Sequence, residues 1–263
     1  MYSLTQKLFA EFIGTFAVVF FAMGAICADE FLRSTGQGAI TTLGLALAYG
    51  IAVGVMVTAL AHISGGHLNP AITIGFWVTK RLSTTLTLLY WIVQILGAVA
   101  AAYLIAAIVP DAPWRPEAMT AINPALALDF TRLHAMLLEG VMTFFLVFVF
   151  FATMVDVKGA FNKIAGFGVG LTVTMDALFG YPLTHAALNP ARAFGPDVAL
   201  GNLSTWWIYL LGPAIGAVAA VGVAYVLRGP ANAGEATAVE GTPLHRGTGN
   251  QEAPVPASRR GPT

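Results

Sequence analysis

Apolar residues gather in six long stretches of the chain, and short polar segments separate them. The hydrocarbon core of a bilayer is about 30 Å thick, so a helix needs roughly 20 apolar residues to cross it. The six stretches are that long, and together they hold only three charged residues, Glu11, Glu139 and Asp176. The pattern therefore predicts six membrane-crossing helices, at residues 8–28, 39–61, 82–109, 133–155, 164–183 and 203–227.

Two further apolar segments, at residues 69–78 and 189–200, are too short to cross a bilayer. Each opens with Asn-Pro-Ala, which favours a helix start: Asn caps the first turn, Pro fits the first helical position, and Ala is a strong helix former. We expect two re-entrant half-helices that begin at Asn69 and Asn189. Irregular backbone at membrane depth is tolerated where it lines a wet cavity, so these segments point to a pore.

The chain repeats itself. Glu11 lies in AEFIGTF and Glu139 in LEGVMTF, 128 residues later; LNPA recurs after 120 residues, and GAVAA recurs after 119 residues. Because three spans precede the second copy, the second half must enter the membrane upside down, which makes an inverted repeat. We therefore divide the chain into a first repeat with its connecting loop (1–132), a second repeat (133–227) and a tail (228–263).

Composition agrees with a membrane protein and limits the other possibilities. Hydrophobic residues make up 57% of the chain and charged residues 10%, against about 25% charged in soluble domains. The net charge is zero, so nothing indicates a nucleic-acid partner, and the single Cys27 excludes an intrachain disulfide framework. The tail is rich in Gly, Pro, Ala and Thr, and we expect it to be disordered.

The charges also predict an orientation. With the loops assigned alternately to the two faces, nine Lys and Arg residues lie on one face and three on the other. Basic residues are enriched on the cytoplasmic side, so both termini are predicted to be cytoplasmic. The loops at 29–38, 110–132 and 184–202 would then be external.

The paired LNPA motifs, together with HISGGHLNPA, ALNPARAFGP and AEFIGTF, resemble the aquaporin superfamily, which includes the glycerol facilitators. The resemblance covers residues 5–227 and implies an all-helical membrane fold of six spans and two half-helices. It implies a homotetramer with one pore in each subunit, and the residues of the chain indicate neither a cofactor nor an enzymatic activity. It also implies that Glu11 and Glu139 support the re-entrant loops. The pore motifs would be Asn69, Pro70 and Ala71, and Asn189, Pro190 and Ala191.

The same resemblance implies a selectivity filter of four residues: Tyr49, Ala177, Ala186 and Arg192. Water-selective relatives usually carry His at the position of Ala177, and glycerol facilitators usually carry Gly and an aromatic residue at the two alanine positions, so this chain fits neither pattern. Two alanines leave more room than bulkier residues would. The sequence therefore favours a passive channel for water and small uncharged solutes such as glycerol, and a strictly water-selective aquaporin is the alternative.

Other interpretations remain open. Inverted repeats with broken helices also occur in alternating-access transporters, although the spans hold only three acidic groups. An intramembrane enzyme would need a nucleophile with a base or a metal cluster, and the sequence contains neither. His67 is a candidate for the cytoplasmic pore mouth rather than a metal ligand, and Asp176 has either a structural hydrogen-bonding role or a role in the vestibule.

Overall fold

The computed structural model describes residues 2–109, 131–155 and 165–229, and every element in these ranges is helical. The first half holds α1 (Leu4–Ser34), α2 (Thr41–Ser64), the short α3 (Pro70–Val78) and α4 (Thr84–Ile108). The second half holds α6 (Arg132–Phe150), continued by a π-helical turn at Phe151–Val155, then α7 (Ala165–Thr184), the short α8 (Pro190–Leu200) and α9 (Trp206–Arg228). Most of the expected tail (228–263) and most of the loop 110–132 lie outside the described residues, and Arg228 is the last residue of α9.

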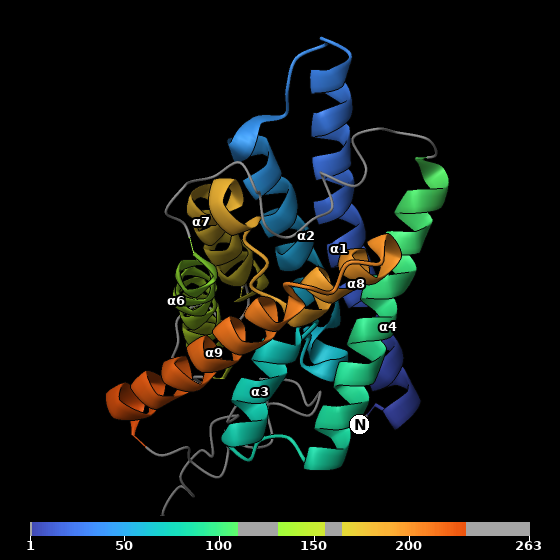
Figure 1. Ribbon diagram of the computed structural model, residues 1–263. Coiled ribbons are helices and arrows are strands. Elements are labelled where there is room, and N and C mark those ends of the chain that lie inside the picture. Colours follow the sequence, from blue (N-terminus) through green and yellow to red (C-terminus); the bar gives the residue numbers. More distant parts are fainter. Residues whose placement is uncertain (1, 110–130, 156–164, 230–263) are drawn as a thin grey trace, which may run out of the picture.

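The long helices form a bundle around the two short ones (Figure 1). Five helices of the described ranges are long and apolar enough to cross a membrane: α1, α2, α4, α6 with its π-helical turn, and α9. The remaining span, α7, is the fifth in chain order, and it is less apolar because it carries four glycines, several threonines and Asp176. Large apolar side chains such as Phe21 and Phe179 are exposed on the outside of the bundle, as lipid-facing residues of a membrane protein are.

Close helix contacts repeat in the two halves. Gly97 of α4 lies against the backbone of Phe12 in α1, and Gly216 of α9 lies against the backbone of Gly140 in α6. These pairs occupy equivalent positions of the two repeats, since Gly97 and Gly216 open the two GAVAA segments. The inverted repeat of the sequence is therefore also a repeat of packing.

The two halves meet along α2 and α7. Gly50 and Gly54 of α2 face Gly170 and Gly166 of α7, and a Cβ atom built on Gly170 would lie 2.5 Å from the carbonyl oxygen of Gly50. Only glycine permits so close an approach of two backbones. This contact fixes the two halves of the bundle side by side.

One expected boundary was wrong. The loop predicted at 29–38 is helical as far as Ser34, because α1 continues well beyond the apolar stretch. Arg33 bonds Asp29 one turn earlier with 2.8 Å between Nε and Oδ2, and the other oxygen of Asp29 accepts the backbone N–H of Ile40 at 2.5 Å. Asp29 thus ties the end of α1 to the start of α2.

Candidate functional site

The two Asn-Pro-Ala segments begin helices as their sequence predicts. Asn69 has extended backbone and its Oδ1 accepts the N–H of Ala71 at 2.8 Å, while Pro70 is the first residue of α3. Asn189 does the same for α8: its Oδ1 accepts the N–H groups of Ala191 at 3.0 Å and Arg192 at 3.3 Å. Each half-helix therefore starts at an asparagine cap inside the bundle.

The two caps also bond across to the opposite half. Nδ2 of Asn69 donates to the carbonyl oxygen of Leu188 at 2.9 Å, and Nδ2 of Asn189 donates to the carbonyl oxygen of Leu68 at 2.9 Å. The N-termini of α3 and α8 are thereby joined head to head. The sequence did not indicate this contact. Each amide group has two hydrogens, so one N–H of each asparagine is used here and one remains.

Each cap follows a loop whose backbone takes left-handed conformations. Leu68 and Leu188 have φ values of 52° and 56°, and Ala186 has φ 43°. Such angles are uncommon for residues other than glycine and persist only where surrounding contacts hold them. Two buried glutamates supply those contacts.

Glu11 of α1 holds the first loop. Its Oε1 accepts the N–H of His67 at 2.9 Å and the hydroxyl of Ser64 at 2.7 Å, and its Oε2 accepts the N–H of Leu68 at 2.6 Å. The side chain is completely buried. A carboxylate in the membrane is therefore fully engaged in fixing the loop.

Glu139 of α6 holds the second loop in the same way. Its Oε1 accepts the hydroxyl of Thr184 at 2.6 Å and the N–H of Ala187 at 2.9 Å, and its Oε2 accepts the N–H of Leu188 at 2.7 Å. With their N–H groups held by the glutamates, Leu68 and Leu188 direct their carbonyl oxygens to the two asparagines.

Two buried tyrosines support the loops and were missed by the sequence reasoning. The hydroxyl of Tyr90 donates to the carbonyl oxygen of Ser64 at 2.8 Å, and that of Tyr209 donates to the carbonyl oxygen of Thr184 at 3.2 Å. The tyrosines are 119 residues apart, the same separation as the two GAVAA segments, so the repeat could have revealed them.

Gln94 is a further loop support, and it belongs to one half alone. Its Nε2 donates to Oε2 of Glu11 at 2.7 Å and to Oγ1 of Thr73 at 3.1 Å. At the separation of 119 residues the second half has Pro213, which has no side-chain donor. The supports of Glu11 and Glu139 therefore differ at this position.

Arg192 and Tyr49 come together on the α8 side of the asparagine pair. Arg192 lies in the first turn of α8 and is 2% exposed, and its Cζ stands 5.4 Å from the centre of the Tyr49 ring. The Tyr49 hydroxyl donates to the carbonyl oxygen of Ala187 at 2.7 Å. Among the described residues, Nε and Nη2 of Arg192 have no hydrogen-bond partner. A fixed cation with open donors thus lies beside an aromatic ring.

The two alanines of the expected filter are completely buried. Ala177 lies on α7, two turns after Val169, and Ala186 lies in the loop next to Gly180 of α7. Asp176 lies within the core at 5% exposure, and its Oδ2 has no hydrogen-bond partner in the described part of the chain. The structural hydrogen bond expected for Asp176 is therefore absent at this oxygen.

His67 lies on the other side of the asparagine pair, at the start of the segment that leads into α3. It is 1% exposed, its Nδ1 is 3.2 Å from Oγ1 of Thr73, and its ring stacks on Phe76 with 4.2 Å between centres. Within the described ranges, no three His, Cys, Asp or Glu side chains are grouped as a metal site would require. His67 thus belongs to a packed aromatic cluster rather than to a group of ligands.

Comparison with known proteins identifies the family. The sequence model described as "Major intrinsic protein" matches residues 1–225. The chain belongs to the major intrinsic protein family. Like other members of this family, it is an integral membrane protein with six spans and two half-helices.

Individual relatives in the major intrinsic protein family cover most of the chain. Aquaporin NIP3-1 of Oryza sativa subsp. japonica is 37% identical over 84% of this chain and 68% of its own length. Nodulin-26 of Glycine max is 34% identical over 85% and 78%, and the lens fiber major intrinsic protein of Ovis aries is 35% identical over 82% and 78%.

The fold is also that of a solved structure of this kind. The X-ray structure of the aquaglyceroporin from Plasmodium falciparum superposes with a TM-score of 0.72 at 24% identity, covering 85% of this chain and 96% of that chain. At this identity the match concerns the arrangement of the helices.

Proposed function

We propose that the chain is a passive channel for water and small uncharged solutes such as glycerol, and that it excludes ions and protons. The observation that carries the proposal is the reciprocal pair of hydrogen bonds from Asn69 and Asn189, which joins two half-helix N-termini inside the bundle. The relatives named as aquaporins support it. The path would run from Tyr49 and Arg192, past the two asparagines, to His67.

Fixed donors and positive charge would give this path its selectivity. Each half-helix N-terminus carries about half an elementary positive charge, and Arg192 adds a full one. A cation therefore meets an electrostatic barrier. Aquaporins are the established example of pores that exclude protons and cations in this way. A neutral hydroxyl oxygen instead accepts hydrogen bonds from the remaining N–H of each asparagine and from Arg192.

The width of the path at Arg192 is the basis for including glycerol. Ala177 and Ala186 have the smallest side chains other than glycine, so the opening beside Tyr49 is wider than histidine would leave it. A strictly water-selective pore is the alternative. It is favoured by the Tyr49 ring, which the contacts to Ala187 and Arg192 hold in one position.

Orientation and assembly complete the proposal. Both termini would lie in the cytoplasm, since nine basic residues assigned to their face outnumber three on the other. The channel would lie in the cell or plasma membrane as a homotetramer with one pore in each subunit, as the family resemblance implies. Its partners would be water, small neutral solutes and lipid, without a cofactor or a nucleic acid.

Reconstitution into liposomes tests the function. In stopped-flow light scattering, liposomes that contain the protein should shrink in an osmotic gradient faster than empty liposomes, and should then reswell as glycerol enters. Flux should rise linearly with the gradient and depend weakly on temperature, whereas a carrier would saturate. Folded protein that leaves both rates at the empty-liposome level would refute the proposal, and water flux without glycerol flux would favour the water-selective alternative.

A further inference from the structure

A cavity of about 740 Å³ lies where α3 ends and α4 begins, and residues 77–78 and 80–84 line it. The end of α3 and the start of α4 lie at the same end of the bundle (Figure 1). Because α4 is a membrane span that begins at Thr84, the cavity lies at a surface of the membrane. None of the residues assigned to the proposed path lines it, so we treat it as a separate site.

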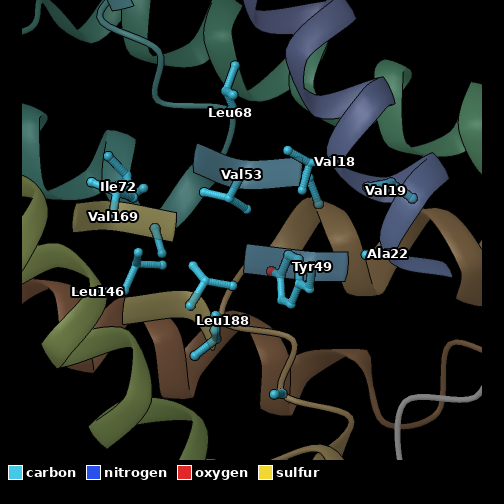
Figure 2. Packing of buried hydrophobic residues seen from close by; sticks show 14 of the residues in the cluster. Val18, Val19, Ala22, Tyr49, Val53, Leu68, Ile72, Leu146, Val169 and Leu188 are labelled. Atoms are coloured by element: carbon cyan, nitrogen blue, oxygen red, sulfur yellow. The ribbon is translucent and has the colours of Figure 1, made fainter. Parts of the chain in front are cut away.

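The outward face of α3 forms one wall of the cavity. Figure 2 shows Ile72 of α3 among buried apolar side chains of other elements. Trp77 comes five residues later, which is about 140° around a helix from Ile72, and it is 41% exposed. Its Nε1 donates to Oγ1 of Thr84 at 3.1 Å and ties α3 to α4. Indole rings are enriched where membrane meets water, and Trp77 has such a position.

Two basic residues lie in the turn between the helices. The N–H of Lys80 donates to the carbonyl oxygen of Trp77 at 2.9 Å, and the N–H of Arg81 donates to that of Phe76 at 2.9 Å. This pair of bonds ends a helix in a left-handed turn, where glycine is usual. Here Lys80 takes the left-handed position, with φ 57°. Arg81 is 8% exposed, so its guanidinium belongs to the wall of the cavity.

The lining of the cavity is suited to an anion. Lys80 and Arg81 bring two positive charges, and none of the described residues that line the cavity is acidic. Oγ of Ser83 caps α4 by accepting the N–H of Leu86 at 3.2 Å, which leaves the hydroxyl hydrogen to donate. The first N–H groups of α4 add further donors. Guanidinium, ammonium and hydroxyl groups together are the chemistry that binds phosphate.

An apolar row leads from the cavity along α4. Residues four apart share one face of a helix, and Leu88, Ile92 and Leu96 follow Thr84 at this interval. All three are at least 50% exposed. Between residues 84 and 96 a helix rises about 18 Å, and one leaflet of the hydrocarbon core is roughly 15 Å thick. The row therefore has the length and the chemistry to carry an acyl chain whose phosphate lies in the cavity.

We propose that the cavity binds the headgroup phosphate of an anionic phospholipid, with one acyl chain along the exposed row of α4. Basic pockets beside membrane helices bind anionic headgroups through the same charges. A free phosphate would satisfy Lys80 and Arg81 and leave the apolar row uncovered, so the position of the cavity favours a lipid. The inference needs the membrane-spanning fold and does not depend on which solutes the channel passes.

Lipid binding to the purified full-length protein in a neutral detergent tests the proposal. In native mass spectrometry, the wild type should retain dioleoylphosphatidylglycerol several-fold more than dioleoylphosphatidylcholine, because the two differ in the charge of the headgroup. Lys80→Gly removes the ammonium group and places glycine where φ is positive, which glycine favours. The fold should therefore be kept while retention of phosphatidylglycerol falls several-fold. Lys7→Gln is the control: it removes a positive charge from the same predicted face, outside the cavity, and should retain phosphatidylglycerol as the wild type does.

Three outcomes would overturn the proposal. The first is equal retention of the two lipids by the wild type, and the second is equal retention of phosphatidylglycerol by Lys80→Gly and Lys7→Gln. The third is a free anion as the ligand: sodium phosphate would then raise the melting temperature of the lipid-free protein above that in sodium chloride of equal ionic strength, without selective retention of phosphatidylglycerol. Melting temperatures without lipid establish that each variant is folded. Lys80→Gln, which also removes the charge, keeps the test decisive if Lys80→Gly is not.

Discussion

Two buried carboxylates, Glu11 and Glu139, hold the backbone of the two re-entrant loops. Each accepts two consecutive backbone N–H groups of a re-entrant loop and one hydroxyl group at the end of the preceding helix. Charged residues within membrane spans are rare and are retained where they have partners. In this chain the partners are backbone groups that would otherwise be unsatisfied at membrane depth.

Glu139→Gln should therefore destabilise the second loop. Glutamine presents an NH2 group where the carboxylate accepted N–H groups, so at least one hydrogen bond to a charged acceptor is lost, which is worth about 1.5–3 kcal/mol. We expect a lower melting temperature in detergent and reduced water permeability. Glu30→Gln, at the polar end of α1, is the control, and equal behaviour of the two variants would contradict the role given to Glu139.

Ala177→His tests the expected selectivity filter. If Ala177 faces the proposed path beside Tyr49 and Arg192, the imidazole fills part of the opening and adds a donor suited to water. Water permeability should stay within a few-fold of the wild type while glycerol permeability falls sharply. Ala177→Ser, which adds one small hydroxyl group, should conduct both. Liposome swelling decides, and glycerol flux that is unchanged in Ala177→His would mean that residue 177 does not face the path.

At this scale the sequence predicted the residues that belong to motifs and missed those that depend on tertiary placement. Asn69 and Asn189 could be found because the Asn-Pro-Ala segments repeat, whereas Arg192 was expected from the family resemblance, since the first segment has Ile72 at the equivalent position. Gln94 sits in an apolar span with no repeat partner, and nothing in its local sequence indicates that it reaches Glu11. The cross-links between the asparagines and the opposite loops likewise depend on how the two halves meet.

The helices were predictable to different degrees. α3 and α8 begin where their sequences indicate, because Asn caps and Pro at the first helical position act locally. The end of α1 could not be predicted, because Asp29 acts there through the N–H of Ile40, which is distant in sequence. The π-helical turn at Phe151–Val155 has no signal that we can identify in the sequence.

Helix contacts through glycine give a prediction at the scale of elements. A Cβ on Gly216 would collide with the backbone of Gly140 and Phe144, so Gly216→Ala should force α9 away from α6. Such overpacking typically costs about 1–3 kcal/mol. Gly222→Ala on the same helix is the matched control, since nothing lies within 4 Å of its Cβ position. Thermal unfolding in detergent should separate the two, and equal melting temperatures would mean that the helices adjust freely.

At the scale of the molecule, polar groups lie in the interior and apolar groups lie on the outside. Glu11, Glu139, Arg192 and both asparagines are buried, whereas the outer surface carries large apolar side chains. The hydropathy pattern predicted the spans and the inverted repeat predicted the opposed half-helices. The packing of His67 against Phe76 and Phe150 could not be predicted, because both phenylalanines look like ordinary apolar residues until α3 and α6 are placed beside His67.

The orientation of the molecule is the last prediction. The loop after α1 and the loop between α3 and α4 lie at opposite ends of the bundle in Figure 1. Gln37 in the first loop is exposed, and so is Thr85 in the first turn of α4, directly after the second loop. In a Cys27→Ala background, which removes the single native cysteine, a cysteine at Gln37 should react with a membrane-impermeant maleimide added to intact cells. A cysteine at Thr85 should react with the maleimide only after the cells are permeabilised, because the nearby basic residues Lys80 and Arg81 are predicted to lie on the cytoplasmic face. The reverse labelling pattern would place both termini outside and invert the direction of the proposed path, so that His67 would meet external solutes before Tyr49 and Arg192.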